Sequence, residues 1–283
     1  MSAAATRTLT LCADDFGLAP DVDRAILKLA AMGRISAVSC MAGGPSWQQS
    51  AAELAQMVSD RLDVGLHLTL TELPPLGPMP QLMAAGNVPN INHLLQHALL
   101  RQVDQSEIRA EARRQIDGFC RYFGRPPDHI DGHQHVHCFP VIRTIIYELA
   151  TEYGCYVRNC ATELSVIRRG AAAWAKAAVI NIMGYGFNAG LEARNIPHNR
   201  QFFGLHDFDP LQDTHAMYAA WLRTAAAGAL INCHPGDGAA PGDALALWRK
   251  HEFDYLRGDA FATLLRETGT TIARFRPPAT PAG

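Results

Sequence analysis

The sequence lacks a strong net charge, because its 283 residues hold 25 Lys and Arg against 27 Asp and Glu. That balance argues against a protein held to nucleic acid by its overall field. It also lacks any apolar run near the roughly 20 residues that a membrane-spanning helix needs. The opening stretch MSAAATRTLTLCADD has no apolar segment and meets two acidic residues, so we expect no secretory signal. These absences predict a soluble, cytoplasmic protein with no nucleic-acid partner and no integral membrane segment.

Paired cysteine spacings are absent too. The seven cysteines are scattered without a C-x-x-C pair, which excludes a disulfide scaffold and a zinc ribbon and predicts reduced, mostly buried thiols. Without a Walker A pattern or a G-x-G-x-x-G after a strand, nucleotide binding has no support, and without G-x-S-x-G neither has a serine hydrolase. His137 and Cys138 are adjacent, and adjacent residues rarely meet as a catalytic pair.

Segments rich in β-branched and apolar residues alternate with segments of helical period, which is typical of a βα-type chain. We expect one α/β domain over residues 1–283, a distorted, TIM-barrel-like (β/α) barrel with its core at 7–275 and a frayed tail at 276–283. A doubly wound open sheet is the alternative. The predicted strands are Thr8–Ala13, Ile35–Met41, Val64–Leu70, His129–Gly132, Tyr156–Cys160, Ala229–Cys233 and Thr270–Phe275. The predicted helices are Pro20–Gly33, Trp47–Val58, Ser106–Phe123, Pro140–Tyr153, Ala171–Ile182, Met217–Ala227 and one or two between Leu245 and Glu267.

Four stretches place metal-ligand or acid/base side chains at the carboxyl ends of predicted strands. They are Asp14-Asp15, His67, the run HIDGHQHVH over 129–137, and His234 before Pro-Gly. Loops from several strands converge at that end of a parallel sheet. Each stretch alone also has a structural explanation, as a cap or turn, a core histidine, a surface cluster or a loop histidine. Four together favour a functional site.

The chemistry of these residues favours a metal site. One of the two adjacent aspartates can hold a cation while the other faces a reacting water, and His67 in an apolar strand needs a partner such as a metal. In the run, His129, Asp131, His133, His135 and His137 share one parity, so an extended segment would aim all five one way. That predicts a divalent cation such as Zn²⁺, Mn²⁺, Ni²⁺ or Co²⁺, with some of the five orienting the ligands. His234 beside such a site can act as a general acid.

Asp14-Asp15-Phe16-Gly17, Gly65-Leu66-His67-Leu68-Thr69-Leu70-Thr71, HIDGHQHVH and His234-Pro235-Gly236 follow one another in this order. With them the chain resembles the YdjC/ChbG-like carbohydrate deacetylases, from about residue 7 to 275. That family removes acetyl groups from N-acetylated sugars such as chitooligosaccharides. The resemblance implies a distorted (β/α) barrel, one divalent metal, usually magnesium or zinc, and in some members a homodimer.

The resemblance also implies a role for each matching residue. Asp15, His67 and His133 would be the metal ligands, Asp14 the general base and His234 the general acid. Asp131, His135 and His137 would support the ligands or contact the substrate.

Two departures from the family's pattern stand out. Gly132-His133-Gln134 replaces the usual S-H-H, with the ligand histidine kept, and Asp237 replaces the usual Tyr after His-Pro-Gly. The second change concerns the rim that faces the substrate, and hence the identity of the sugar. Because hopanoid-pathway members also exist, a lipid-linked amino sugar is an alternative to a chitooligosaccharide.

We therefore expect metal-assisted hydrolysis of an acetamide on a sugar, with the loop Glu72–Asn92 as a lid or substrate wall. One alternative is a metal-dependent hydrolase of another amide or of a phosphoester. A phosphate substrate would call for a Lys/Arg cluster, and none sits beside the four motifs. The other alternative is a metal- or sugar-binding protein without turnover, which would need neither a base nor an acid.

Overall fold

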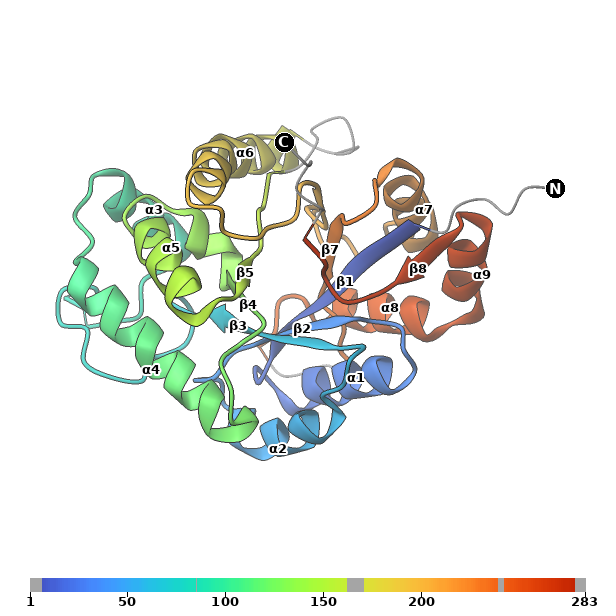
Figure 1. Cartoon of the computed structure of the whole chain (residues 1–283), viewed down its shortest axis with the longest axis horizontal. Helices are drawn as coiled ribbons and strands as arrows, with labels where there is room; N and C mark the ends of the chain where they lie inside the picture. Colours follow the sequence, from blue (N-terminus) through green and yellow to red (C-terminus); the bar gives the residue numbers. More distant parts are fainter. Residues whose placement is uncertain (1–6, 85, 162–170, 239–241, 278–283) are drawn as a thin grey trace.

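Strands and helices alternate along the computed structural model, which describes residues 7–84, 86–161, 171–238 and 242–277 (Figure 1). The strands are β1 (Arg7–Phe16), β2 (Ala37–Cys40), β3 (Asp63–Leu68), β4 (His129–Gly132), β5 (Tyr156–Val157), β6 (Phe202–Phe203), β7 (Leu230–Cys233) and β8 (Thr270–Ile272). The helices are α1 (Pro20–Ala31), α2 (Trp47–Met57), α3 (Ile91–Leu99), α4 (Gln105–Phe123), α5 (Ile142–Tyr153), α6 (Ala171–Glu192), α7 (Thr214–Thr224), α8 (Ala246–Arg257) and α9 (Asp259–Glu267). A short 3₁₀ helix, η1, covers His133–Cys138.

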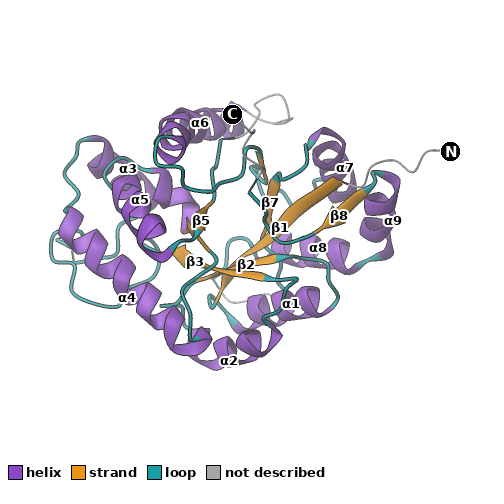
Figure 2. Ribbon diagram, in the orientation of Figure 1, coloured by secondary structure: helices purple, strands orange, loops and turns teal. Residues whose placement is uncertain are grey.

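The strands form one parallel sheet in the order β5-β4-β3-β2-β1-β7-β6, and β8 pairs with the first residues of β1. The sheet curls back on itself, because Val157 at one edge makes a parallel bridge to His198, just before the strand at the other edge. Asn159 and Asn199 add hydrogen bonds across the same seam. Helices surround the curled sheet (Figure 2). The predicted distorted barrel is confirmed, and the open doubly wound sheet was the wrong alternative.

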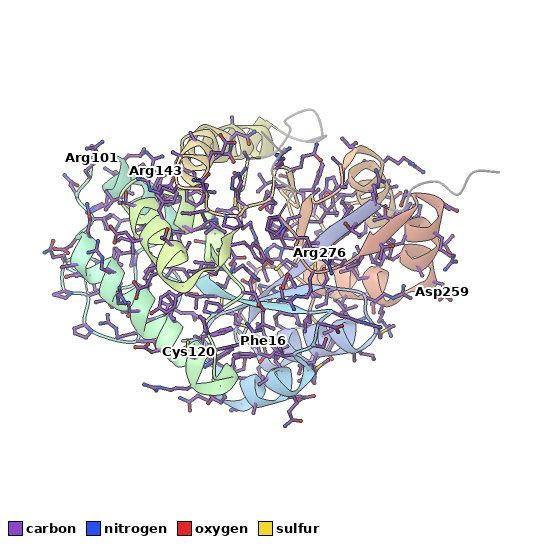
Figure 3. All side chains as sticks on the ribbon, in the orientation of Figure 1. Phe16, Arg101, Cys120, Arg143, Asp259 and Arg276 are labelled. Atoms are coloured by element: carbon purple, nitrogen blue, oxygen red, sulfur yellow. The ribbon has the colours of Figure 1, made fainter. Side chains whose placement is uncertain are left out.

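Both faces of the central strands are covered, which is why they are apolar with little alternation. Every residue of β2, β3 and β7 is buried. Helix α1 begins with Pro20 at its first turn and buries the face that carries Val22, Ile26 and Leu29. Side chains fill the space between sheet and helices, with Phe16 at the end of β1 fully buried (Figure 3).

Several element boundaries differ from the expected ones. Helix α3 follows the long loop and was not predicted. Helix α4 begins one residue earlier than expected, at Gln105, because the Asp104 side chain caps it by accepting hydrogen bonds from the backbone N–H groups of Ser106 and Glu107. Strand β5 is only two residues long, where five were expected. Helix α6 extends ten residues beyond the predicted end, to Glu192.

All seven cysteines are free thiols and six are buried, as the scattered spacing predicted. Within the described residues, the helices are too short or too polar to cross a membrane. The extent of the domain, 1–283, stays a prediction, since residues 1–6 and most of the tail, 278–283, lie outside the described part of the chain.

Candidate active site

The two aspartates at the end of β1 point in different directions because the strand is irregular there. The pairing of β1 with β2 shifts register between Ala13 and Phe16, and Asp15 adopts a left-handed backbone with φ 70°. Such a conformation is costly for a non-glycine residue and clusters at functional sites. It turns the Asp15 carboxylate toward His67 of β3 and His133 of η1 and leaves Asp14 facing the inside of the barrel.

Asp15, His67 and His133 come together from β1, β3 and η1. Oδ1 of Asp15 lies 3.4 Å from Nε2 of His67 and 3.1 Å from Nδ1 of His133. One ligand atom from each residue lies within 4.8 Å of the others. The side chains of Asp15 and His67 are buried, whereas 12% of the His133 side chain is exposed. A carboxylate and two imidazoles at this spacing suit a divalent cation reached from the side of His133.

The ring of His67 is held in place by Asp131. Its Nδ1 lies 2.6 Å from Oδ1 of Asp131, so its Nε2 faces Asp15. The other oxygen of Asp131 accepts from Oγ of Ser39 at 2.6 Å and lies 2.6 Å from a nitrogen of Arg158. Burial acts to lower the pKa of His67, but the Asp131 carboxylate outweighs it and raises that pKa to about 10. A carboxylate behind a histidine fixes its tautomer and orients it toward a metal.

His133 is held from its other side by Glu72. Its Nε2 lies 2.9 Å from Oε2 of Glu72, and the Gln134 amide donates to the other carboxylate oxygen at 2.6 Å. Glu72 begins the long loop expected as a lid or substrate wall. That loop therefore contacts the cluster directly, while its role stays a prediction.

Asp14 is buried and paired with Arg158. Its two oxygens lie 2.6 and 2.7 Å from the two terminal nitrogens of the guanidinium, and Nδ2 of Asn232 donates to it at 3.1 Å. Burial acts to raise the pKa of Asp14, but the Arg158 charge outweighs it and holds that pKa below its usual value. Oδ2 of Asp14 also lies 3.8 Å from Nε2 of His234. An ionised carboxylate thus faces an imidazole beside the three candidate metal ligands.

His234 follows β7 and is fixed through its backbone. Its N–H donates to Oε2 of Glu252 at 2.6 Å. That buried carboxyl also accepts from the Tyr218 hydroxyl at 2.8 Å and the Trp248 indole at 3.3 Å. The pKa of His234 falls to about 4, because burial disfavours the charged ring more than nearby carboxylates favour it. Burial likewise raises the pKa of Glu252 to about 7. The imidazole of His234 is therefore neutral near neutral pH.

The histidine-rich run does not aim its five side chains one way, and that expectation was wrong. The strand ends at Gly132, and Gln134 and His135 take left-handed backbone angles, φ 52° and 60°. A 3₁₀ turn replaces the extended segment, so alternate residues no longer point their side chains the same way. His129 and Asp131 stay inside the barrel, His133 joins Asp15, and His135 and His137 lie against Cys160.

His129 packs beneath the site. Its Nε2 lies 2.9 Å from the Ser39 hydroxyl, and its ring stacks on Tyr156 at 4.9 Å between centroids. A Cβ on Gly65 of the neighbouring strand would overlap this ring. The glycine in Gly65-Leu66-His67 thus leaves room for a side chain that supports the site.

Sequence reasoning missed Arg158, Arg249 and Glu252. Arg249 donates to Asp15 at 2.8 Å, on the side away from the histidines. We expected no Lys/Arg cluster beside the four motifs, but the fold brings two arginines to the site, one from directly after β5 and one from α8, both outside the motifs in sequence. A charged residue inside the predicted strand Tyr156–Cys160 was the available signal for Arg158.

Asp237, the residue that departs from the family's pattern, points away from this cluster. Its carboxylate pairs with Arg24 of α1 at 2.7 Å, and its N–H donates to the backbone oxygen of Asp21 at 3.1 Å. The substitution therefore ties the loop after His234 to α1.

Curated relatives match part of the chain. A chitooligosaccharide deacetylase of Proteus mirabilis (strain HI4320) is 36% identical over 150 residues, which is 53% of this chain and 58% of that protein. A carbohydrate deacetylase of Mus musculus is 33% identical over 174 residues, 60% of this chain and 54% of that protein. The match therefore spans little more than half the length of these relatives.

Comparison with solved structures supports the fold. A crystal structure from Enterococcus faecalis V583, described as a candidate cellobiose-phosphate cleavage protein, aligns with a TM-score of 0.75 at 21% identity. The alignment covers 95% of this chain and 98% of that one. A family model described as YdjC-like protein matches residues 8–267. Since this match covers most of the sequence, including all four motifs, the chain belongs to the YdjC-like family.

Proposed function

We propose that this protein is a metal-dependent hydrolase that removes the acetyl group from an N-acetylated sugar. The observation that carries the proposal is the placement of Asp14 and His234, 3.8 Å apart, beside the cluster of Asp15, His67 and His133. A base and an acid next to a cation site are what hydrolysis of an unreactive amide needs. The deacetylase names of the relatives support the sugar acetamide as substrate.

Asp15, His67 and His133 would hold one divalent cation, magnesium or zinc. The donor set fits, because Asp131 keeps Nε2 of His67 directed at Asp15, and the two imidazoles favour Zn²⁺ over Mg²⁺. When bound, such a cation polarises a carbonyl oxygen and lowers the pKa of bound water.

The chain's own residues would move one proton. Asp14, kept ionised by Arg158, takes a proton from the water whose oxygen bonds to the acetyl carbon. His234 is neutral beforehand, so the proton that it gives to the departing nitrogen is the one from water, passed on from Oδ2 of Asp14. The carbon–nitrogen bond then breaks and leaves a free amine and acetic acid, which loses its remaining proton to the solvent and becomes acetate.

The alternatives fit less well. Both arginines at the site are already paired, Arg158 with Asp14 and Asp131 and Arg249 with Asp15, so neither offers a free charge to a phosphoester. A protein that only binds a metal or a sugar has no need of the Asp14–His234 arrangement. A lipid-linked amino sugar remains the alternative substrate to a chitooligosaccharide.

The test is acetate release from a panel of N-acetylated sugars, with added divalent metal and with chelator. We expect release that chelator abolishes and that added Zn²⁺ or Mg²⁺ restores. Release that chelator does not affect would contradict the metal. If the soluble sugars give none, the panel extends to lipid-linked amino sugars, and no release from these either would contradict the deacetylase.

We also propose that the protein works in the cytoplasm, since seven free thiols suit a reducing compartment. The homodimer implied by the family resemblance stays a prediction.

A further inference from the structure

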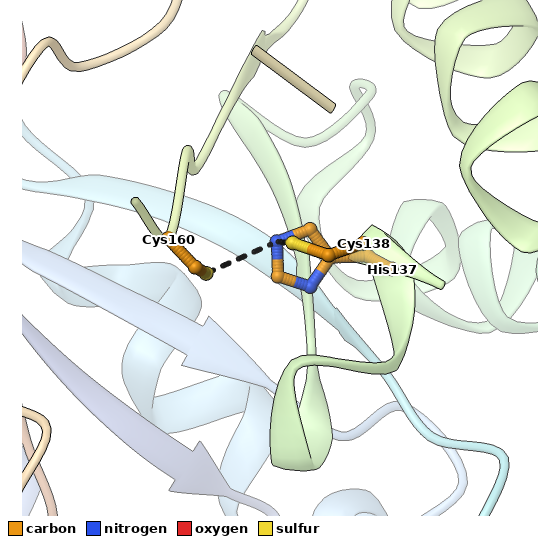
Figure 4. Close-up of side chains that lie close together, drawn as sticks. All are labelled: His137, Cys138 and Cys160. Carbon is orange, nitrogen blue, oxygen red and sulfur yellow. Dashed lines mark hydrogen bonds between the residues drawn. The ribbon is translucent and has the colours of Figure 1, made fainter. Parts of the chain in front are cut away.

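A second group of metal-ligand side chains lies outside the candidate active site. His137 and Cys138 end the η1 helix, and Cys160 lies three residues beyond β5. All three are buried, and their side chains lie close together (Figure 4). Nε2 of His137 lies 3.5 Å from the sulfur of Cys138 and 3.5 Å from that of Cys160. One ligand atom from each residue lies within 4.8 Å of the others.

These distances match a tetrahedral zinc site. With zinc–sulfur bonds of about 2.3 Å and zinc–nitrogen bonds of about 2.05 Å, a tetrahedral angle separates nitrogen from sulfur by about 3.6 Å. Both nitrogen–sulfur separations at His137 are 3.5 Å. The spacing of the His137 nitrogen and the two sulfurs therefore suits such an ion.

Two further groups lie beside the three residues. Nε2 of His137 lies 2.9 Å from the carbonyl oxygen of Arg158, which accepts its proton. A cation on Nε2 would replace that proton, and the His137 ring and this carbonyl group would have to move apart to admit it. Nδ1 of His135 lies 3.3 Å from the sulfur of Cys160 and is a further donor beside the group. Because His135 is only half-buried, its side offers the ion a route in.

We propose that His137, Cys138 and Cys160, with His135 as the fourth ligand, bind a second divalent cation of the zinc class. Thiolates and imidazoles together select such an ion over Mg²⁺ and Ca²⁺. The site joins η1, which carries the active-site residue His133, to the segment after β5. A cation bound here would thus hold η1 in place, and η1 supplies one of the proposed ligands of the first site. This inference does not rest on the proposed function.

The simpler reading is a cluster of neutral, packed thiols. Burial raises the pKa of the Cys160 thiol well above its ordinary value, so that thiol stays protonated without a cation. Metal binding would displace its proton and leave a sulfur–metal bond, which can be seen directly.

Co²⁺ is the probe, because thiolate bound to Co²⁺ absorbs strongly in the near ultraviolet whereas carboxylate and imidazole ligands do not. The full chain, reduced and freed of metal by chelator, is titrated with Co²⁺. We expect two bound equivalents and a thiolate charge-transfer band that saturates with one of them, and Zn²⁺ should abolish the band. Saturation without any such band would overturn the proposal, whatever the enzyme does with sugars.

Variants identify the residues that give rise to the charge-transfer band. Cys138→Ser and Cys160→Ser should each lose or strongly weaken it and bind one equivalent fewer. Cys155→Ser, which alters a buried cysteine just before β5, should keep it, and so should His67→Ala, which disables the first site. A band that survives both Cys138→Ser and Cys160→Ser would overturn the assignment. Circular dichroism checks that each variant is folded, and the wild-type titration decides the question even if one is not.

Discussion

Asp14 and Arg158 form a two-pronged ion pair inside the barrel, with nitrogen–oxygen distances of 2.6 and 2.7 Å. The same guanidinium lies 2.6 Å from Asp131, which in turn orients His67. One arginine thus connects the proposed base with the carboxylate behind a proposed metal ligand. Both aspartates are buried, so removing the arginine would leave two carboxylates without their main counter-charge.

We predict that Arg158→Lys lowers kcat by on the order of 100-fold, because lysine keeps the charge but cannot make the paired contacts. Arg158 holds the pKa of Asp14 down against burial, so a weaker contact should let that pKa rise. The acidic limb of the pH–rate profile should then move to higher pH. A profile that keeps its acidic limb in place while kcat falls would show that Arg158 acts only through the fold.

Asp14→Asn should leave the cation in place and reduce turnover about 1,000-fold or more. The amide keeps the shape of the carboxylate but cannot take a proton from water. Turnover is measured as acetate release, and cation binding by calorimetry on the same preparation. Near-normal turnover would refute the assignment of Asp14 as base. Loss of both properties would instead make Asp14 part of the cation site.

The convergence of the stretches that carry Asp15, His67 and His133 could be anticipated from sequence, because each lies near the end of a predicted strand and parallel strands share a carboxyl edge. The choice of these three as ligands came from the family resemblance. The direction of the histidine run could not be anticipated. It depended on two left-handed residues, Gln134 and His135, and neither is a glycine that would have marked the turn.

Arg158 and Glu252 could not be anticipated for a different reason. Their contacts reach across 144 residues to Asp14 and 18 residues to His234, so no local spacing carries them. They emerge only when the sheet curls, so that Arg158 reaches Asp14 across the inside of the barrel and Glu252 of α8 meets the backbone of His234. The barrel itself was predictable from the alternation of strands and helices. Helix α3 was missed because it directly follows a long, proline-rich loop.

Asp131→Asn should weaken cation binding at the first site by about 10- to 100-fold without removing any ligand. The amide cannot hold Nδ1 of His67 as a carboxylate does, so Nε2 is no longer fixed toward Asp15. The measurement is a Zn²⁺ titration in the Cys160→Ser background, which leaves one site. Asp128→Asn is the matched control, since Asp128 lies just before the same strand and binds Arg125 instead. Equal affinities for the two variants would contradict a role for Asp131 in orienting His67.

Glu252 should make the protein less stable as the pH rises. Its pKa is about 7 in the folded state, where burial disfavours the charge, against an ordinary value of 4.5. A group with a raised folded pKa contributes stability that is fully present below the unfolded pKa. That stability is lost as the pH climbs through the folded pKa. As the pH rises from 4.5 to somewhat above 7, the contribution of Glu252 to the free energy of unfolding falls by on the order of 3 kcal/mol.

Glu252→Gln isolates this effect. The amide oxygen can still accept from the His234 N–H and the Trp248 indole, and the amide nitrogen can donate to the Tyr218 oxygen. Urea unfolding of both proteins from pH 4 to 8 gives the free energy of unfolding at each pH. The difference, wild type minus variant, should fall as the pH rises, because only the wild type has this carboxyl to ionise. A difference that stays constant over this range would mean that Glu252 keeps an ordinary pKa despite its burial.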